Sequence, residues 1–186
     1  MIDAGELRKG IAIELEGKIY QVTDYRHIKM GRGSAQIRLR LRDIRSSNTI
    51  ERSFQASDKF TPAFLEHHSV QYLYSDASLY YFMDNESYEQ IALTADQIGE
   101  AVNYLKEGLN LEILTHKDET VNIELPAAVE LEVTETEPGF KGNTATGGNK
   151  PAKVETGITI QVPLFINMGD IIKVNTRSGE YLEKAS

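Results

Sequence analysis

The chain has 186 residues, of which 40% are hydrophobic and 26% charged, so we expect a folded protein with a buried core. Its 20 Lys and Arg against 28 Asp and Glu give a net charge of −8, which excludes a protein that coats nucleic acid through bulk positive charge. Cysteine is absent, which excludes disulfides, thiolate nucleophiles and Cys-rich zinc sites. The sequence shows no secretory-signal pattern, and no apolar run approaches the about 20 residues that a membrane span needs. We therefore expect a cytoplasmic protein that does not contact membranes.

The charge is uneven along the chain. Residues 1–63 hold 12 basic and 8 acidic side chains, a net charge of +4. Residues 64–126 hold 2 and 12, a net charge of −10, and residues 127–186 hold 6 and 8, a net charge of −2. The distribution favours a polyanionic partner for the first third alone, and the alternative is a chance distribution of surface charge.

The first third is predicted to be strands. Residues 11–15 and 19–28 are separated by a turn at 16–18, and a third strand covers 35–44. The stretch 36–44 has period two, with apolar residues on one face and arginines on the other: Ile37, Leu39 and Leu41 opposite Arg38, Arg40 and Arg42. The arginine face is either an ordinary solvated face or a stripe of guanidinium groups for phosphates.

The remaining two thirds also predict mostly short strands. One helix is expected after Thr94, which forms a capping box with Gln97, and Gly108 can end it. The expected strands are 70–74, 79–83, 88–93, 109–115, 119–125, 129–133, 153–162 and 171–175. Three segments of about 60 residues with several short strands each predict small β-barrels, and we place the domains at 1–63, 64–126 and 127–186.

The sequence shows no enzyme motif. The four histidines are scattered, and the adjacent pair His67 and His68 would point to opposite faces of a strand, so no metal site is predicted. No P-loop or other nucleophile or metal motif is present, and the acidic residues of the middle third are interpreted as a solvated surface. We therefore expect neither catalytic residues nor a cofactor.

The segment 29–34 lies between two predicted strands and has Arg32 between Gly31 and Gly33. The glycines permit a slim turn because they accept positive φ. Such a charged finger suits a crowded polyanionic cavity, and the alternative is a plain hairpin turn with an exposed arginine.

At these residues the chain resembles a known family. The blocks at 13–20 and 27–35 are similar to the N-terminal start and functional hairpin of bacterial elongation factor P. The blocks at 72–76 and 81–84 resemble its middle domain, and 156–181 resembles its C-terminal signature.

The resemblance implies an all-β fold, with an SH3-like (KOW-type) barrel followed by two OB-fold barrels in an L-shaped array of tRNA-like outline. It implies a monomeric, non-enzymatic translation factor that binds the 70S ribosome between the peptidyl-tRNA and exit sites. There it would stimulate peptide-bond formation at consecutive prolines, with prolyl-tRNA as a partner. The alternatives are a family paralogue that prefers other stalling motifs, or a generic OB-fold RNA-binding protein.

The resemblance also implies roles for residues. The tip residues Gly31, Arg32 and Gly33 would approach the peptidyl-tRNA 3′ end, while Lys29, Arg38, Arg40 and Arg42 would contact RNA phosphates. A loop in the last third would approach the exit-site codon of the messenger RNA through Gly142, Asn143, Thr144, Gly147, Gly148 and Lys150. Arg32 matches the position that part of the family rhamnosylates through an arginine rhamnosyltransferase, whereas Met30 and Gly33 depart from that group's hairpin. Rhamnosylated and unmodified Arg32 both stay open.

Overall fold

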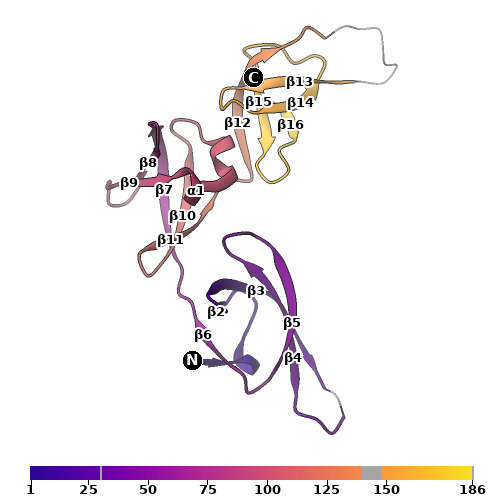
Figure 1. The fold of residues 1–186 in the computed structure, drawn as a ribbon. Helices are drawn as coiled ribbons and strands as arrows, with labels where there is room; N and C mark the ends of the chain where they lie inside the picture. The colour runs from indigo at the N-terminus through magenta and orange to yellow at the C-terminus, as the bar shows by residue number, and fades with distance from the viewer. Residues whose placement is uncertain (30, 140–147, 186) are drawn as a thin grey trace. The chain divides into compact units, whose positions relative to one another are not determined.

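The computed structural model describes residues 1–29, 31–139 and 148–185, and it consists mainly of β-strands in three sheets (Figure 1). The chain divides into two compact units. The first unit is Met1–His67 with Leu114–Asn122, and the second is His68–Ile113 with Ile123–Ser186. The L-shaped arrangement and the three domain boundaries stay predictions.

The first sheet has six strands in the order β1-β6-β2-β3-β4-β5, and its recorded pairings are antiparallel. The strands are β1 (Ile2–Asp3), β2 (Ala12–Leu15), β3 (Lys18–Ile28), β4 (Gln36–Asp43), β5 (Thr49–Gln55) and β6 (Lys59–Pro62), with a 3₁₀ turn η1 (Ala4–Glu6) after β1. The expected turn joins β2 to β3, because Glu16 and Gly17 both have positive φ, as a two-residue hairpin requires. The strands β1, β5 and β6 lie outside the strands that were predicted.

The second sheet has the order β11-β10-β7-β8-β9. Its strands are β7 (Glu66–Ser75), β8 (Leu79–Asp84), β9 (Gln90–Thr94), β10 (Asn110–His116) and β11 (Glu119–Glu124). The predicted capping box is confirmed: the Gln97 backbone N–H donates to Thr94 Oγ1 at 3.3 Å, and the Thr94 N–H donates to Gln97 Oε1 at 2.9 Å. The prediction of one continuous helix is wrong, because Gly99 has φ 66° and divides it into α1 (Ala95–Ile98) and the 3₁₀ helix η2 (Gly99–Tyr104).

The third sheet has the order β14-β13-β12-β15-β16. Its strands are β12 (Ala128–Thr136), β13 (Asn149–Val154), β14 (Thr159–Pro163), β15 (Ile171–Asn175) and β16 (Tyr181–Lys184). The predicted strand 153–162 is thus two strands, because the chain turns at Gly157, which has φ 96°. Tyr104 and Leu109 pack against the core of this sheet, so the second and third sheets share apolar contacts within the second unit.

Each sheet buries one alternating face in its own core. The core of the first sheet includes Ile13 and Val22 together with Ile37, Leu39 and Leu41, the apolar face predicted for 36–44. Among the described residues, no helix is long and apolar enough to span a membrane.

Candidate functional site

The hairpin of β3 and β4 carries the predicted tip. Its pairing runs from Tyr20 opposite Asp43 to Ile28 opposite Gln36, with an irregularity between Val22 and Asp24. Ile37 is completely buried, only a few residues from the tip. Because one face of the hairpin is held in the core, the segment between the strands projects from an anchored base.

At the tip, Gly31 has φ 38°, which lies in the left-handed region that favours glycine. Arg32 and Gly33 are both exposed. Within the part of the chain that the structure describes, the Arg32 side chain has no hydrogen-bond or ion-pair partner. The guanidinium therefore keeps its donors for an external acceptor.

A second group of side chains ties β3 to the N-terminal segment. The Tyr25 hydroxyl hydrogen-bonds to His27 Nε2, and the two rings meet edge to face with centroids 5.0 Å apart. The Arg8 guanidinium lies 5.3 Å from the centre of the Tyr25 ring and donates to the carbonyl oxygens of Gly5 and Leu7 at 3.0 and 2.7 Å. Tyr25 and His27 are two residues apart on β3 and therefore share one face, whereas nothing in the sequence indicated the contact with Arg8.

The basic side chains predicted to contact phosphates are not equivalent. Arg38 Nε lies 3.4 Å from a carboxylate oxygen of Glu51 on β5, so its charge is partly compensated. Arg42 is half-buried and donates to Ser47 Oγ at 3.4 Å. Arg40 and Lys29 are exposed, and among the described residues neither side chain has an ion-pair partner. Contact with RNA phosphates stays a prediction for all four residues. Of the three arginines on β4, Arg40 has the side chain with the fewest interactions within the protein.

The predicted messenger-RNA loop falls mostly outside the described residues, which include neither Gly142, Asn143 and Thr144 nor Gly147. Gly148 is half-buried. Lys150 is 6% exposed, and its Nζ donates to the Glu137 carbonyl oxygen at 2.5 Å. The position of Lys150 on β13 turns the side chain inward, and its contact with the messenger RNA stays a prediction.

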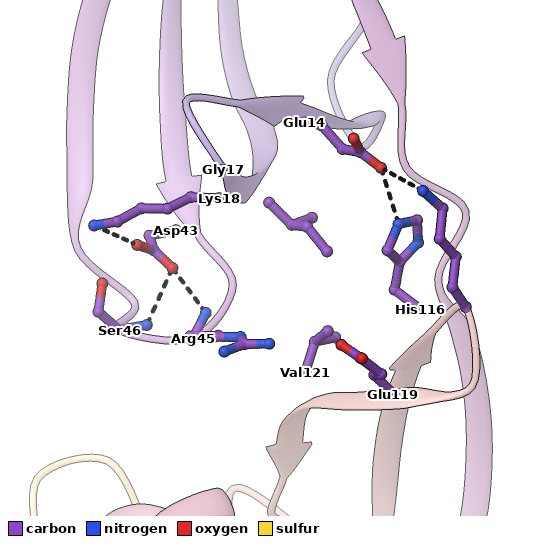
Figure 2. Close-up of a pocket in the computed structure, with 11 residues that line it drawn as sticks. Glu14, Gly17, Lys18, Asp43, Arg45, Ser46, His116, Glu119 and Val121 are labelled. Carbon is purple, nitrogen blue, oxygen red and sulfur yellow. Dashed lines mark hydrogen bonds and ion pairs between the residues drawn. The ribbon is translucent and has the colours of Figure 1, made fainter.

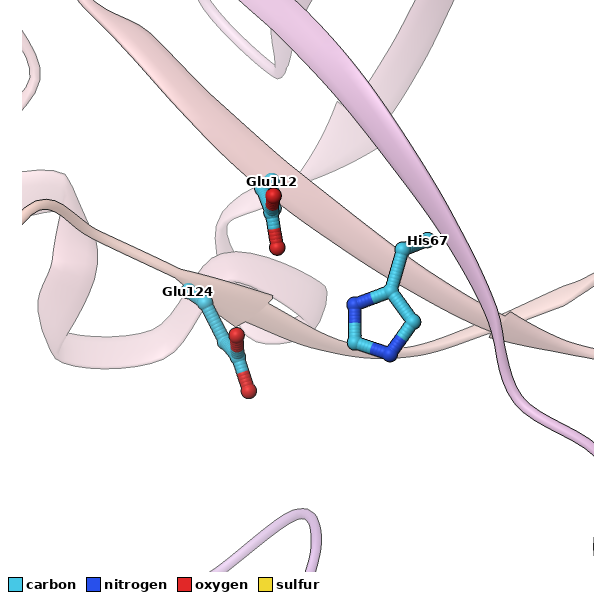
Figure 3. A group of neighbouring side chains, drawn as sticks. All are labelled: His67, Glu112 and Glu124. Atoms are coloured by element: carbon cyan, nitrogen blue, oxygen red, sulfur yellow. The ribbon is translucent and has the colours of Figure 1, made fainter.

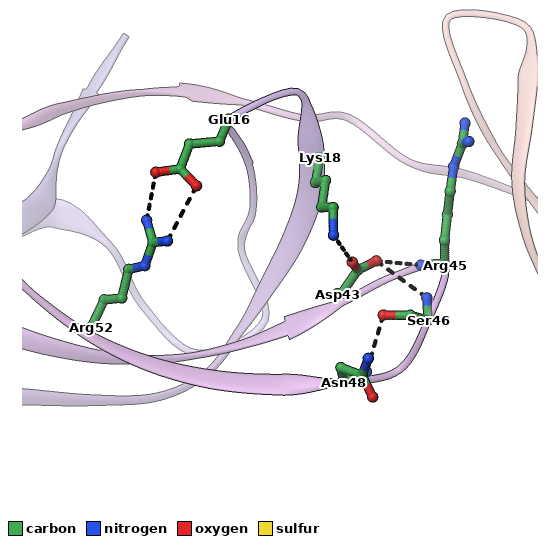
Figure 4. A network of polar contacts seen from close by, with 7 residues as sticks. All are labelled: Glu16, Lys18, Asp43, Arg45, Ser46, Asn48 and Arg52. Atoms are coloured by element: carbon green, nitrogen blue, oxygen red, sulfur yellow. Dashed lines mark hydrogen bonds and ion pairs between the residues drawn. The ribbon is translucent and has the colours of Figure 1, made fainter.

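A buried carboxylate at the end of β4 was also missed (Figure 4). Asp43 is 5% exposed, and its Oδ1 accepts hydrogen bonds from the backbone N–H groups of Arg45 and Ser46 at 2.9 and 3.2 Å. Lys18 Nζ lies 3.5 Å from Oδ2. Burial raises the pKa of Asp43, but the Ser46 and Arg45 hydrogen bonds and the Lys18 charge outweigh it, so the pKa is lowered. A signal existed, because Asp43 continues the inward-facing parity of Ile37, Leu39 and Leu41.

Beside this group, Glu16 in the β2–β3 turn accepts two hydrogen bonds from Arg52 of β5, at 2.8 and 3.2 Å (Figure 4). The hydrogen bonds and the charge of Arg52 lower the pKa of Glu16. This pair joins the β2–β3 turn to the middle of β5 and brings together residues 36 apart in sequence.

The second sheet carries one group of side chains of the kind that ligate metals: His67, Glu112 and Glu124 (Figure 3). Their ligand atoms all lie within 4.8 Å of one another, and all three residues are exposed. Exposed acidic groups are common without a metal, so this group by itself does not define a metal centre.

Three family models match the chain. The elongation factor P KOW-like domain matches residues 3–60, the elongation factor P OB domain matches residues 65–123, and the elongation factor P C-terminal domain matches residues 129–184. The KOW-like and OB domains agree with the three sheets and confirm the predicted fold class.

Curated relatives agree over the full length. Elongation factor P of Thermoanaerobacter sp. (strain X514) is 51% identical over 184 residues, covering 99% of this chain and 100% of the relative. Elongation factor P of Acetivibrio thermocellus has the same identity and coverage.

Among solved structures, eukaryotic translation initiation factor 5A from Methanococcus jannaschii is 21% identical, with a TM-score of 0.50 over 66% of this chain and 92% of that one. A translation initiation factor eIF-5A family protein from Naegleria fowleri is 17% identical, with a TM-score of 0.54 over 66% and 93%. At these identities the likeness shows the fold alone. The family models and the full-length relatives establish more: the chain belongs to the elongation factor P family of translation elongation factors.

Proposed function

We propose that the chain binds the ribosome between the peptidyl-tRNA and exit sites and relieves stalling at consecutive prolines. Arg32 would lie next to the 3′ end of the peptidyl-tRNA. The observation that carries this proposal is the exposed Arg32 guanidinium, which has no partner among the described residues and stands on a glycine-flanked turn. Family membership supports a role in elongation, and the tip supports a contact with a polyanion.

The proposed mechanism is positioning rather than proton transfer. A guanidinium stays protonated at physiological pH, so Arg32 can neither remove a proton nor attack a carbonyl carbon. It can donate several hydrogen bonds to phosphate or ribose oxygens and so restrict the motion of the tRNA end. Holding two reactants in the correct geometry contributes up to roughly 7–11 kcal/mol to a reaction, and a slowly reacting prolyl donor needs only part of that.

The second proposed contact is with the messenger RNA. We propose that the glycine-rich loop at 142–150 approaches the exit-site codon through its backbone N–H groups. Small side chains permit such an approach. Because Lys150 donates to Glu137 within the protein, the proposed contact does not depend on its charge.

The test is translation of a reporter with three consecutive proline codons. Arg32→Ala should abolish the rescue and leave the melting temperature unchanged, because an exposed turn substitution alters stability by no more than about 0.5 kcal/mol. Arg177→Ala is the matched control, since Arg177 is also exposed, on a turn that contains Gly179, and it should retain full rescue. Full activity of Arg32→Ala would refute the proposal, and an equally large loss of stability would make Arg32 structural.

The state of Arg32 has its own measurement. The mass of the protein from its native host should exceed the sequence mass by about 146 Da if the arginine carries one deoxyhexose, and should equal it if the arginine is unmodified. Arg32→Lys then separates the two mechanisms. Lysine keeps the charge but loses the planar group, so it should retain much of the rescue if bare charge suffices and fail if the sugar is required.

A further inference from the structure

The first unit contains a cavity of about 560 Å³, which is lined by residues at the start of β3 and the end of β4, at the end of that hairpin opposite to the tip (Figure 2). It lies between the β2–β3 turn, the β4–β5 turn and the tip of the β10–β11 hairpin. Its charged lining residues are three bases and three acids besides His116: Lys18, Arg45 and Lys117, and Glu14, Asp43 and Glu119. The volume falls in the range of about 300–1,000 Å³ that is typical of small-molecule sites.

One wall is held by interactions within the protein. Glu14 Oε1 lies 3.0 Å from His116 Nε2 and 3.4 Å from Lys117 Nζ. The other ring nitrogen of His116 lies 3.0 Å from the carbonyl oxygen of Phe64. On the opposite wall, Asp43 is engaged by Lys18 and by two backbone N–H groups. Besides His116, the four charged side chains of Glu14, Lys117, Asp43 and Lys18 are therefore already paired before any ligand binds.

Two other residues that line the cavity, Arg45 and Glu119, carry charges of opposite sign. The Arg45 guanidinium and the Glu119 carboxylate are exposed, and neither side chain has a hydrogen-bond or ion-pair partner among the residues that the structure describes. They belong to different elements, Arg45 to the β4–β5 turn and Glu119 to the start of β11. Ile19 and Val121 supply apolar surface to the same cavity.

We propose that this cavity binds a small zwitterion of dipeptide size, with its carboxylate on Arg45, its ammonium on Glu119 and its apolar side chains against Ile19 and Val121. Arginine presents a planar pair of donors that matches a carboxylate. A carboxylate such as Glu119 accepts hydrogen bonds from an ammonium group. A nucleotide or polyphosphate fits poorly, because it would face as many acidic as basic groups in the lining.

The ligand would contact the β4–β5 turn and the β10–β11 tip at once. Because it binds the folded first unit, it should raise the stability of that unit in proportion to the logarithm of its concentration above the dissociation constant. This property is independent of Arg32, so it can be tested whether or not the proposed function is correct.

The experiment titrates the full-length protein with L-leucyl-L-leucine and follows the backbone amide signals by NMR. Signals of Arg45, Glu119 and Val121 should shift in a saturable way. Blocking the ligand's ammonium by N-acetylation, or its carboxylate as the amide, should weaken binding about tenfold or more, because each removes a charge-assisted hydrogen bond.

Variants assign each end of the ligand. Glu119→Gln should weaken binding of the free dipeptide about tenfold but leave the affinity for the N-acetylated form unchanged. Arg45→Gln should weaken binding of the free dipeptide to the same extent but leave the affinity for the amide unchanged. Glu135→Gln and Arg177→Gln, both outside the first unit, are the controls and should bind as the unaltered chain does. Absence of saturable shifts at millimolar dipeptide, or equal affinities of all four variants, would overturn the proposal.

Discussion

Replacing Asp43 tests how strongly a single buried carboxylate stabilises the first unit. Its Oδ1 accepts two backbone hydrogen bonds, from Arg45 and Ser46, and the residue is 5% exposed. A hydrogen bond to a charged group contributes about 1.5–3 kcal/mol to stability. Because two such bonds are lost, Asp43→Ala should lower the free energy of unfolding of the first unit by about 3 kcal/mol or more. The ion pair with Lys18 adds little, because that side chain is 62% exposed. Asp43→Asn keeps an acceptor oxygen and should cost about half as much.

The assay is amide hydrogen exchange at buried β4 positions such as Leu41, which reports the free energy of opening of the first unit. Asp76 provides the control, with exchange read at a buried position of its own sheet such as Phe82. Its Oδ1 also accepts two backbone hydrogen bonds, from Ser78 and Leu79 at 3.0 and 2.9 Å, but on the exposed surface. Asp76→Asn should therefore cost clearly less than Asp43→Asn. Equal losses would show that burial does not strengthen the interaction.

The same carboxylate predicts a pH dependence. The folded-state pKa of Asp43 is lowered from its ordinary value of 3.8, so its contribution is fully present above that value and is lost as the pH falls through the folded-state pKa. The stability difference between the unaltered chain and Asp43→Asn should thus be constant from neutral pH to about pH 5 and shrink under more acidic conditions. A difference that does not change on acidification would refute the assignment of the effect to the ionised carboxylate.

Three further predictions follow from other contacts. An ideal Cβ on Gly139 would clash with the carbonyl oxygen of Leu164, so Gly139→Ala should cost about 1–3 kcal/mol in urea unfolding, and an unchanged midpoint would contradict this packing. Thr94→Ala removes the capping box and should cost about 1 kcal/mol by the same measurement, whereas Thr94→Ser should restore most of it. Charge reversal of Arg40 and Arg42 should weaken binding to purified ribosomes and reduce the salt dependence of the affinity; an unchanged salt dependence would argue against phosphate contacts.

The local structure is predictable from the amino-acid sequence wherever one short-range pattern dominates. Period-two alternation at 36–44 placed Ile37, Leu39 and Leu41 in the core because successive side chains of a strand point to opposite faces. The Thr94 capping box formed because both its partners lie within one turn. The glycine-flanked Arg32 was likewise exposed at the end of a hairpin, as expected from the steric freedom of glycine.

Which polar groups are buried and paired depends instead on how distant parts of the chain pack together. Lys150 was expected in a loop that approaches messenger RNA, and its strand directs the side chain inward to the Glu137 carbonyl oxygen. Glu14 and His116 are 102 residues apart in sequence, and no local pattern relates them. The cavity that both residues line exists because strands distant in the chain meet around it. The free energy of burying a charge depends on that complete surrounding rather than on neighbouring residues in the sequence.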